Sequence, residues 1–227
     1  MTTGRTHVDE VQRRMRAVPA PRPVLDRDAE RRLTDRQRDI LDRLGTTFDG
    51  GFAHLTMLDL ASRLGCSLRT LYALAPSRDE LVLVVVDRNL WRVGRSARDA
   101  IGRDMAPLDA VRAYLAAVTV AVNGATAAFA RDLAAVPAAS RLSDGHNDYV
   151  FAVTRALLDL AVERRDIAAV DTSAVARVMA GLGREFSRPE VIPDLRSTPK
   201  DAADAVVDVI LHGLRTAARH DARPGAA

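Results

Sequence analysis

Side chains that can bind phosphate and the edges of bases gather in the short segment 57–76. Ser67 and Thr70 carry hydroxyl groups, and Tyr72 carries a phenol. Arg69 adds a guanidinium whose paired donors match the two acceptors on guanine. On a helix that starts after Ser67, these residues fall on or near the outward face, together with Leu68. The segment therefore predicts a helix that presents hydrogen-bond donors to the major groove of DNA.

The same segment meets the steric demands of a helix-turn-helix. Two short helices that cross steeply need a small residue at their contact and a residue that tolerates positive φ in the turn. Ala61 supplies the small contact, and Gly65 supplies the turn. The expected buried set is Leu60, Leu64, Cys66, Leu71 and Leu74. An ordinary helical hairpin would follow the same pattern, so the pattern alone leaves both interpretations open.

Helix signals along the rest of the chain predict an all-α protein of about nine helices. Capping boxes, in which Ser or Thr precedes Gln, Asp or Glu by three residues, open helices at Thr34, Thr56 and Ser77. The helix after Ser77 is expected to run to Ile101. Further helices are expected near 108–122, 125–138, 147–165, 172–186 and 200–218.

These signals divide the chain into four parts. Residues 1–33 show no sustained apolar period and are predicted to form a flexible basic arm; residues 34–76 form the helix-turn-helix domain, a second domain spans 77–218, and 219–227 form a disordered tail. We expect arginines of the arm to add phosphate or minor-groove contacts. The arginines concerned are Arg13, Arg14, Arg16, Arg31 and Arg32.

The composition is that of a globular protein with an uneven distribution of charge. Residues 1–104 hold 19 Arg against 15 Asp and Glu, whereas 105–227 hold 14 Arg and Lys against 15. A basic surplus at the N-terminal end fits a short DNA-binding module followed by a neutral domain. Arginine-rich and alanine-rich composition also arises from a GC-rich genome, so the overall composition alone decides nothing.

Other functional classes lack the residues that they need. The single Cys66 cannot form an internal disulfide, and the histidines lack metal-ligand spacing, so neither a metal nor another cofactor is expected. Gly181-x-Gly183 lacks a third glycine and a preceding strand, and no constellation typical of an enzyme is found. The first 30 residues lack the apolar core of a secretory signal, which favours a cytoplasmic protein. The uncharged stretch 113–130 is interpreted as two buried helices meeting at Gly124, not as a membrane span.

Residues 36–91 resemble the N-terminal domain of the TetR family of transcriptional repressors. The residues that carry the resemblance are Ile40, Leu41, Leu44, Phe48, Gly51, Phe52, Thr56, Asp59, Leu60, Ala61, Gly65, Ser67, Thr70, Leu71, Tyr72, Pro76, Ser77, Arg78, Asp79, Glu80 and Leu81. The resemblance implies a homodimer that binds a double-stranded DNA operator and is released by a small-molecule effector. It also implies that Thr56 and Tyr72 contact phosphates, and that Arg78 takes the place of a phosphate-binding lysine.

The chain departs from the family pattern on the predicted recognition helix. Arg69 stands where glycine is common, which adds a potential reader of guanine. Ala73 and Ala75 stand where the family commonly has Tyr and Phe. Residues 34–78 hold six Arg and five Asp, a low charge for a DNA-binding module. These departures leave an alternative open, namely a TetR-like ligand-binding or interaction module without sequence-specific DNA binding.

The resemblance also implies an effector cavity among the helices of residues 82–186 and a dimer contact through the helices near 172–186 and 200–218. The aromatic candidates for the cavity are Trp91, Tyr114, Phe129, Tyr149 and Phe151, with Asn147 and Arg155 as polar anchors. Each of the aromatic residues could equally be part of the core. The two C-terminal helices carry an apolar stripe that could cover their own domain or pair with a second copy.

Overall fold

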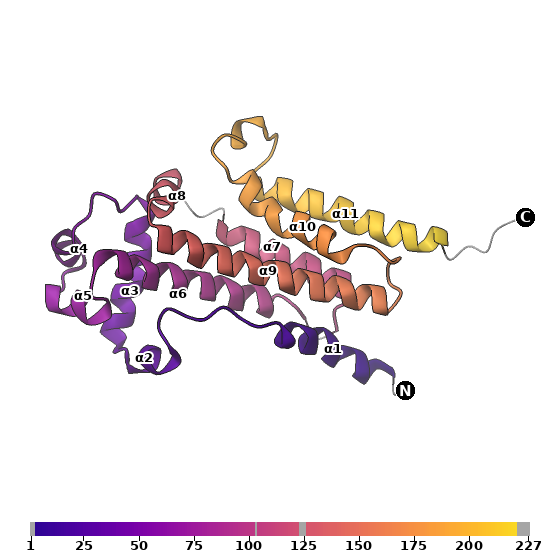
Figure 1. The fold of residues 1–227 in the computed structure, drawn as a ribbon, viewed down its shortest axis with the longest axis horizontal. Coiled ribbons are helices and arrows are strands. Elements are labelled where there is room, and N and C mark those ends of the chain that lie inside the picture. The colour runs from indigo at the N-terminus through magenta and orange to yellow at the C-terminus, as the bar shows by residue number, and fades with distance from the viewer. Residues whose placement is uncertain (1–2, 103, 123–125, 222–227) are drawn as a thin grey trace, which may run out of the picture. The chain divides into compact units, whose positions relative to one another are not determined.

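A computed structural model describes residues 3–102, 104–122 and 126–221, and the regular structure in these ranges is helical, without strands (Figure 1). The predicted all-α fold class is therefore confirmed. The helices are α1 (Thr3–Ala17), α2 (Arg27–Arg32), α3 (Asp35–Asp49), α4 (Met57–Leu64), α5 (Leu68–Leu74), α6 (Arg78–Asp99), α7 (Pro107–Val122), α8 (Ala127–Ala134), α9 (Pro137–Glu163), α10 (Thr172–Phe186), the 3-10 helix η1 (Ile192–Asp194) and α11 (Pro199–Asp221).

The chain forms two compact units, which we call the helix-turn-helix unit and the bundle unit. The helix-turn-helix unit consists of Pro21–Val93 and Gly124–His146. The bundle unit consists of Met1–Ala20, Gly94–Asn123 and Asn147–Ala227. The structure thus groups the chain differently from the predicted division between residues 76 and 77. The reason is that α8, the start of α9 and most of α6 pack with the helix-turn-helix.

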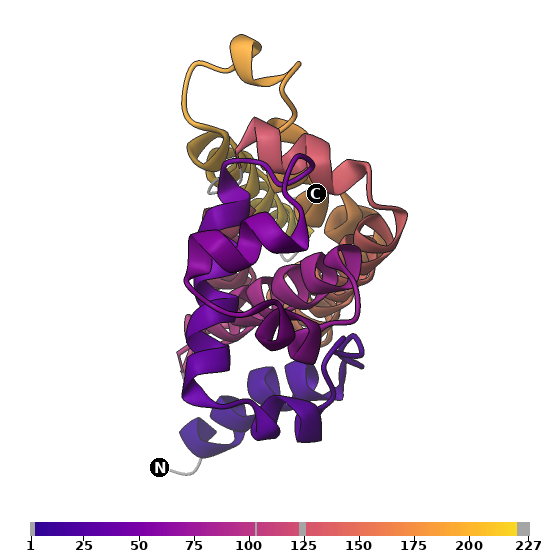
Figure 2. The same cartoon turned by 90° about the vertical axis from the view of Figure 1, so that its left-hand side faces the viewer.

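Local sequence signals build the three helices α3, α4 and α5, which face the viewer in Figure 2. Thr34 and Thr56 each cap a helix through a complete capping box, and Ser67 caps α5. Gly65 ends α4 in the left-handed conformation, with φ 61° and ψ 40°. Leu60 and Leu71 are fully buried between these helices, which confirms the inner face that their spacing predicts.

Helix α8 holds the loop between α3 and α4. The carboxylate of Asp132 accepts hydrogen bonds from the backbone N–H groups of Phe52, at 2.6 Å, and Ala53, at 2.7 Å. These two bonds lower the pKa of the Asp132 carboxyl below its usual value, and the bond from Ala53 has the larger effect. The ring of Phe129 on α8 packs edge-on against that of Phe52, with centroids 6.0 Å apart. The loop is therefore fixed by a contact between residues about 80 positions apart in sequence.

Gly51 in this loop is required by its backbone and by its neighbours. Its φ is +91°, and a Cβ there would lie 3.1 Å from Asp132 Oδ2 and 3.2 Å from Ala128 Cβ. We expect Gly51→Ala to lower the free energy of unfolding by about 1–3 kcal/mol, as measured by urea denaturation. Gly145 is the control, because it lies within α9 with open space around the Cβ position. Gly145→Ala should raise the free energy of unfolding by about 0.5–1 kcal/mol. A Gly51→Ala variant as stable as the wild type would contradict the role of this loop.

The bundle unit packs α10 against both α7 and α11. Its core includes Tyr114 of α7, which is fully buried, and Tyr149 of α9, which is 9% exposed. The Tyr114 hydroxyl has no hydrogen-bond partner among the described residues. Burial raises the pKa of this hydroxyl well above its ordinary value.

The N-terminal residues form helices, so the prediction of a flexible arm over residues 1–33 is wrong. Val11 and Met15 of α1 are each 2% exposed and belong to the core of the bundle unit. Arg14 pairs with Glu163, so this arginine stabilises the fold and is not an unattached basic group. The apolar stripe of α1 is narrow and lies among arginines, which concealed its period in the sequence.

Three smaller boundaries also differ from the prediction. Helix α8 ends at Ala134, and α9 begins at Pro137, about ten residues earlier than expected, because proline suits the first position of a helix. Helix α11 continues to Asp221, so only 222–227 of the predicted tail remain, and these lie outside the described residues. Gly124, where two helices were expected to meet, also lies outside them. None of the helices in the described ranges is both long and apolar enough to cross a membrane.

Candidate nucleic-acid interface

Helix α5 presents the outward face that its sequence predicts. Leu68 is 37% exposed and Tyr72 is 53% exposed. Ser67, Arg69 and Ala73 are also exposed, whereas Thr70 is half-buried. On the inner face Leu71 and Leu74 are buried, but Cys66, expected in the core, is only half-buried. The residues of the candidate DNA-reading face therefore lie on one exposed side of a short, firmly packed helix.

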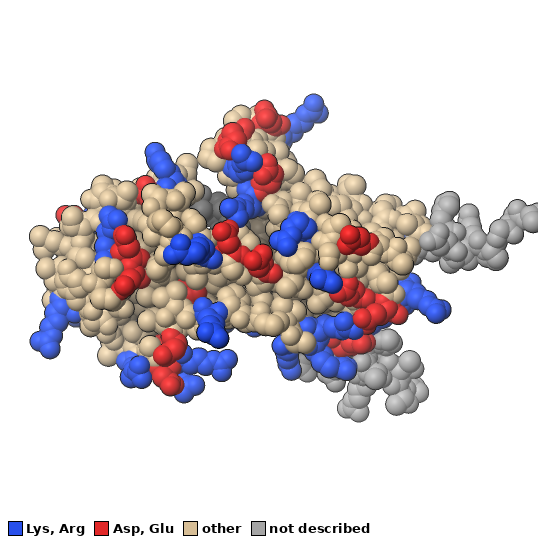
Figure 3. Space-filling model, viewed as in Figure 1, with Lys and Arg blue, Asp and Glu red and all other residues tan. Residues whose placement is uncertain are grey.

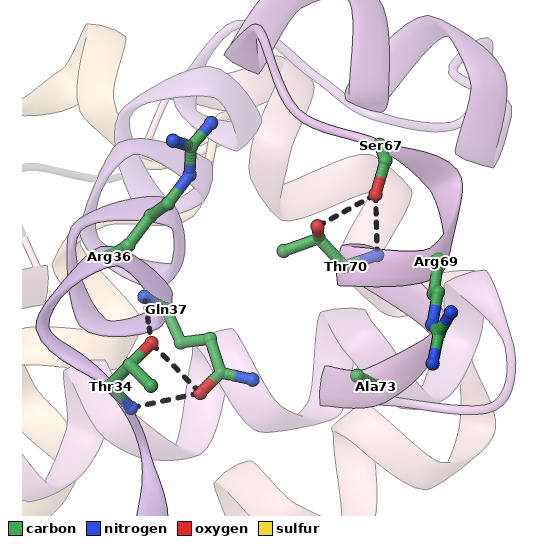
Figure 4. Close-up of a pocket in the computed structure, with 7 residues that line it drawn as sticks. All are labelled: Thr34, Arg36, Gln37, Ser67, Arg69, Thr70 and Ala73. Carbon is green, nitrogen blue, oxygen red and sulfur yellow. Dashed lines mark hydrogen bonds between the residues drawn. The ribbon is translucent and has the colours of Figure 1, made fainter.

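Hydroxyl groups hold the start of α5 in place. Ser67 Oγ accepts the backbone N–H of Thr70 at 3.2 Å and lies 2.9 Å from Thr70 Oγ1 (Figure 4). Arg69 lies between Ser67 and Thr70 in sequence and is the exposed charged residue at the start of the helix. Its guanidinium forms no ion pair with any described residue.

The two donors of Thr56 that the resemblance assigns to phosphate are engaged within the protein. The backbone N–H donates to Asp59 Oδ2 at 2.9 Å, and the hydroxyl donates to the same oxygen at 2.6 Å. Both bonds lower the pKa of the Asp59 carboxyl, and the bond from the hydroxyl has the larger effect. Thr56 can therefore contact a phosphate only if these donors are shared with Asp59 or released by it.

Arg78 is similarly engaged. Its Nη1 donates to the carbonyl oxygen of Ala53 at 2.9 Å and reaches that of Leu55 at 3.5 Å. Its Nε and Nη2 donate to Asp79 Oδ1 at 3.1 Å and 2.9 Å. Arg78 thus fastens the loop before α4 to the start of α6, whatever else it binds.

A groove of about 360 Å³ separates the start of α3 from α5 (Figure 4). The residues that line it are Thr34, Arg36, Gln37, Ser67, Arg69, Thr70 and Ala73. The sequence does not predict Arg36 and Gln37 as site residues, because they precede the helix-turn-helix segment and Gln37 forms half of a capping box. Only the packing of α3 against the helix-turn-helix brings them opposite Arg69.

Ion pairs neutralise the acidic side chains near this groove but not the arginines that line it. Three carboxylates of α3 pair with arginines, Asp35 with Arg38 at 3.0 Å, Asp39 with Arg43 at 3.7 Å and Asp42 with Arg88 at 3.6 Å. Arg36 and Arg69, which line the groove, have no carboxylate partner among the described residues. The low net charge of residues 34–78 therefore understates the positive charge at this surface.

The candidate effector residues are divided between the two units. Trp91 and Phe129 belong to the helix-turn-helix unit, and the other five belong to the bundle unit. The five in the bundle unit are Tyr114, Asn147, Tyr149, Phe151 and Arg155. The ring of Trp91 lies edge-on to that of His146, with centroids 5.7 Å apart. Arg155 is exposed and lies 3.7 Å from the carboxylate of Asp159, and Asn147 is exposed as well.

Comparison with known proteins adds a relationship at the level of structure. No protein-family model and no curated protein matches the sequence. A TetR transcription regulator from Haloarcula marismortui matches with a TM-score of 0.68 and 18% identity, over 80% of this chain and 99% of that one. PfmR, a TetR family regulator from Thermus thermophilus, matches with a TM-score of 0.57 and 22% identity, over 77% and 98%. A regulatory protein of the tetR family from Rhodococcus matches with a TM-score of 0.60 and 18% identity, over 80% and 98%.

The chain is an all-helical protein that carries a helix-turn-helix with an exposed second helix. Its fold is that of the TetR family of transcriptional regulators.

Proposed function

We propose that this chain is a DNA-binding transcriptional regulator of the TetR type that acts in the cytoplasm as a homodimer. The observation that carries the proposal is the exposed face of α5, where Arg69 and Tyr72 project from a helix whose inner residues, Leu71 and Leu74, are buried. A helix presented in this way fits the major groove of DNA. Release of a repressor by a small ligand is the mode of action that the family resemblance favours.

Arg69 provides the test of sequence-specific binding. We expect Arg69→Ala to reduce discrimination between the preferred duplex and a scrambled one by about 1–3 kcal/mol, because one bidentate contact to guanine is lost. The measurement is a gel-shift titration with the intergenic DNA upstream of the chain's own gene, at several salt concentrations. Arg63→Ala is the control, since Arg63 is an exposed arginine of α4 that does not line the groove. Equal sequence preference in Arg69→Ala and the wild type would refute the role of Arg69 in base reading.

The alternative function, a TetR-like module without sequence-specific DNA binding, is supported by a specific observation. Thr56 and Arg78, both implied phosphate ligands, already donate to groups within the protein. If the wild type binds every duplex equally and only through salt-sensitive contacts, this alternative is favoured.

Homodimer formation is supported by the outward faces of α10 and α11. Val178 is 55% exposed and Val209 is 72% exposed. Their exposed neighbours one helical turn away are Ala174 and Gly181 on α10, and Ala205, His212 and Gly213 on α11, so all of them except His212 are small. Over α11 the surface in Figure 3 is mostly uncharged. Small and apolar residues along one side of each helix allow close helix packing, and the occupant that we propose is the same face of a second copy.

Ligand control would act through α6 and the buried polar group of the bundle unit. Helix α6 contributes residues to both units, so a shift along it can reach the helix-turn-helix. The unpartnered hydroxyl of Tyr114 is a candidate to bind a polar atom of an otherwise apolar effector. The effector must bind the released conformation more tightly than the DNA-bound one, because equal affinity for both shifts nothing.

A further inference from the structure

We propose that the groove between α3 and α5 binds a phosphate group of the DNA backbone, with Arg36 and Gln37 as its ligands on α3. The inference rests on the proposed function and extends the DNA contact from the helix-turn-helix to a helix outside it. The groove lies beside the exposed start of α5, so a strand of a duplex that receives α5 in its major groove passes close to it.

The lining of the groove favours an anion. It contains two arginines and no carboxylate. Arg36 and Arg69 come from α3 and α5, so positive charge is contributed from both sides (Figure 4). Asp35, the acidic residue next to Arg36 in sequence, is paired with Arg38 at 3.0 Å. A phosphodiester in the groove therefore meets hydrogen-bond donors and no carboxylate that would repel it.

The capping box of α3 turns the Gln37 side chain into a donor. Gln37 Oε1 accepts the backbone N–H of Thr34 at 2.9 Å and the Thr34 hydroxyl at 3.1 Å. The acceptor of the amide is thus used by the cap, and the amide nitrogen points into the groove (Figure 4). Reading adenine needs both the oxygen and the nitrogen of a glutamine, whereas a phosphate oxygen needs only the nitrogen. Gln37 in this orientation is suited to the DNA backbone and not to a base.

Arg36 is held at the turn of the helix-turn-helix and keeps donors for a ligand. Its Nη2 donates to the carbonyl oxygen of Gly65 at 3.3 Å. A guanidinium has five N–H donors, and this bond uses one of them. The bond to Gly65 holds the Arg36 guanidinium at the groove before a ligand binds. Binding therefore costs less side-chain entropy than it would for an arginine without such a bond.

A matched pair of variants tests the phosphate contact of Arg36. Arg43 also lies on α3, and its Nη1 also donates to a carbonyl at the end of α4, that of Leu64 at 3.1 Å, but Arg43 does not line the groove. Arg36→Gln and Arg43→Gln therefore remove the same charge and a comparable internal bond, and Arg43→Gln in addition breaks the exposed 3.7 Å pair with Asp39. The measurement is affinity for the duplex that the wild type prefers in the gel-shift titration, followed by fluorescence anisotropy over a range of salt concentrations.

We expect Arg36→Gln to reduce the slope of log affinity against log salt by about 0.9 for each bound copy of the chain. Arg43→Gln should keep the wild-type slope, and both variants should keep the wild-type preference for sequence. A wild-type slope in Arg36→Gln, with sequence-specific binding intact, overturns the phosphate site alone. A wild type without sequence preference refutes the proposed function, and a wild type that binds no duplex refutes both proposals.

Gln37→Glu provides a second test with the fold preserved. Glutamate is a natural partner in a capping box, so the cap of α3 should persist and the urea midpoint should stay at the wild-type value. A carboxylate in the groove should lower duplex affinity by at least about tenfold, because it repels phosphate. Unchanged affinity in a folded Gln37→Glu protein would overturn the proposal.

Free inorganic phosphate offers the same chemistry as the DNA backbone and needs its own arm of the experiment. We expect phosphate to compete with the duplex no better than chloride at matched ionic strength, because the groove is open and holds a single group weakly. Stronger competition by phosphate that disappears in Arg36→Gln would assign the groove to the free anion and overturn its assignment to the DNA backbone.

Discussion

Val209→Glu is expected to convert the proposed dimer to monomers and to lower affinity for a duplex with two half-sites by a factor of about 10²–10⁴. The side chain of Val209 is 72% exposed on α11, so the substitution leaves the fold of a single chain intact. In an isologous dimer the new carboxylate would be buried twice without a partner, which opposes association. Each recognition helix would then bind alone, without the gain from a linked second site. Sedimentation velocity gives the mass, and anisotropy gives the affinity.

Val120 supplies the control for this prediction. It is a valine of α7 that is 57% exposed, and it lies on neither α10 nor α11. Val120→Glu should leave both the mass and the affinity unchanged. A Val209→Glu protein that keeps the dimer mass would refute the assigned interface, and equal dissociation of the two variants would show that the effect is not specific to α11.

The helix-turn-helix could be predicted because its determinants are local. Each of its helices starts at a capping residue, and the turn uses Gly65 with φ 61°. The residues Leu60, Ala61 and Leu64 recur at helical spacing and are all buried. Such signals lie within a few residues of the structure that they specify, so one sequence is enough to identify them.

The features that could not be predicted depend on residues far apart in the chain. Arg14 of α1 pairs with Glu163, and Asp132 of α8 fixes the loop at Phe52 and Ala53. The sequence around these residues contains no signal that predicts the ion pair or the hydrogen bonds. The same reason explains the groove, since α3 and α5 bring Arg36 opposite Arg69 only after packing.

The charge of residues 34–78 also depends on contacts that the sequence does not reveal. Six Arg and five Asp in residues 34–78 suggested a weak electrostatic contribution to DNA binding. In the structure Asp35, Asp39 and Asp42 are each paired with an arginine. Net charge treats all groups alike, whereas DNA meets only the groups that remain unpaired on one surface. The location of charge therefore outweighs its sum.

A buried pair between α6 and α9 carries the second large expected effect. Asp87 is 3% exposed, and its Oδ2 accepts the backbone N–H of Val24 at 2.8 Å. Its Oδ1 lies 3.2 Å from His146 Nε2, and the Trp91 ring lies edge-on to His146. One carboxylate thus joins the segment before α2, helix α6 and the first half of α9 within the helix-turn-helix unit.

We expect Asp87→Ala to lower the free energy of unfolding by about 2–5 kcal/mol, because it breaks a buried pair, leaves a His146 ring nitrogen without its acceptor and removes the bond to the Val24 N–H. Trp91 is the single tryptophan of the chain, so intrinsic fluorescence reports on this site during urea unfolding. Asp99→Ala is the control, since Asp99 is an exposed aspartate at the end of the same helix. Its removal should change stability little, because a carboxylate is unfavourable near the C-terminus of a helix. If Asp87→Ala unfolds at the same urea concentration as Asp99→Ala, the buried pair does not hold α6 to α9, and α6 is free to move without breaking it.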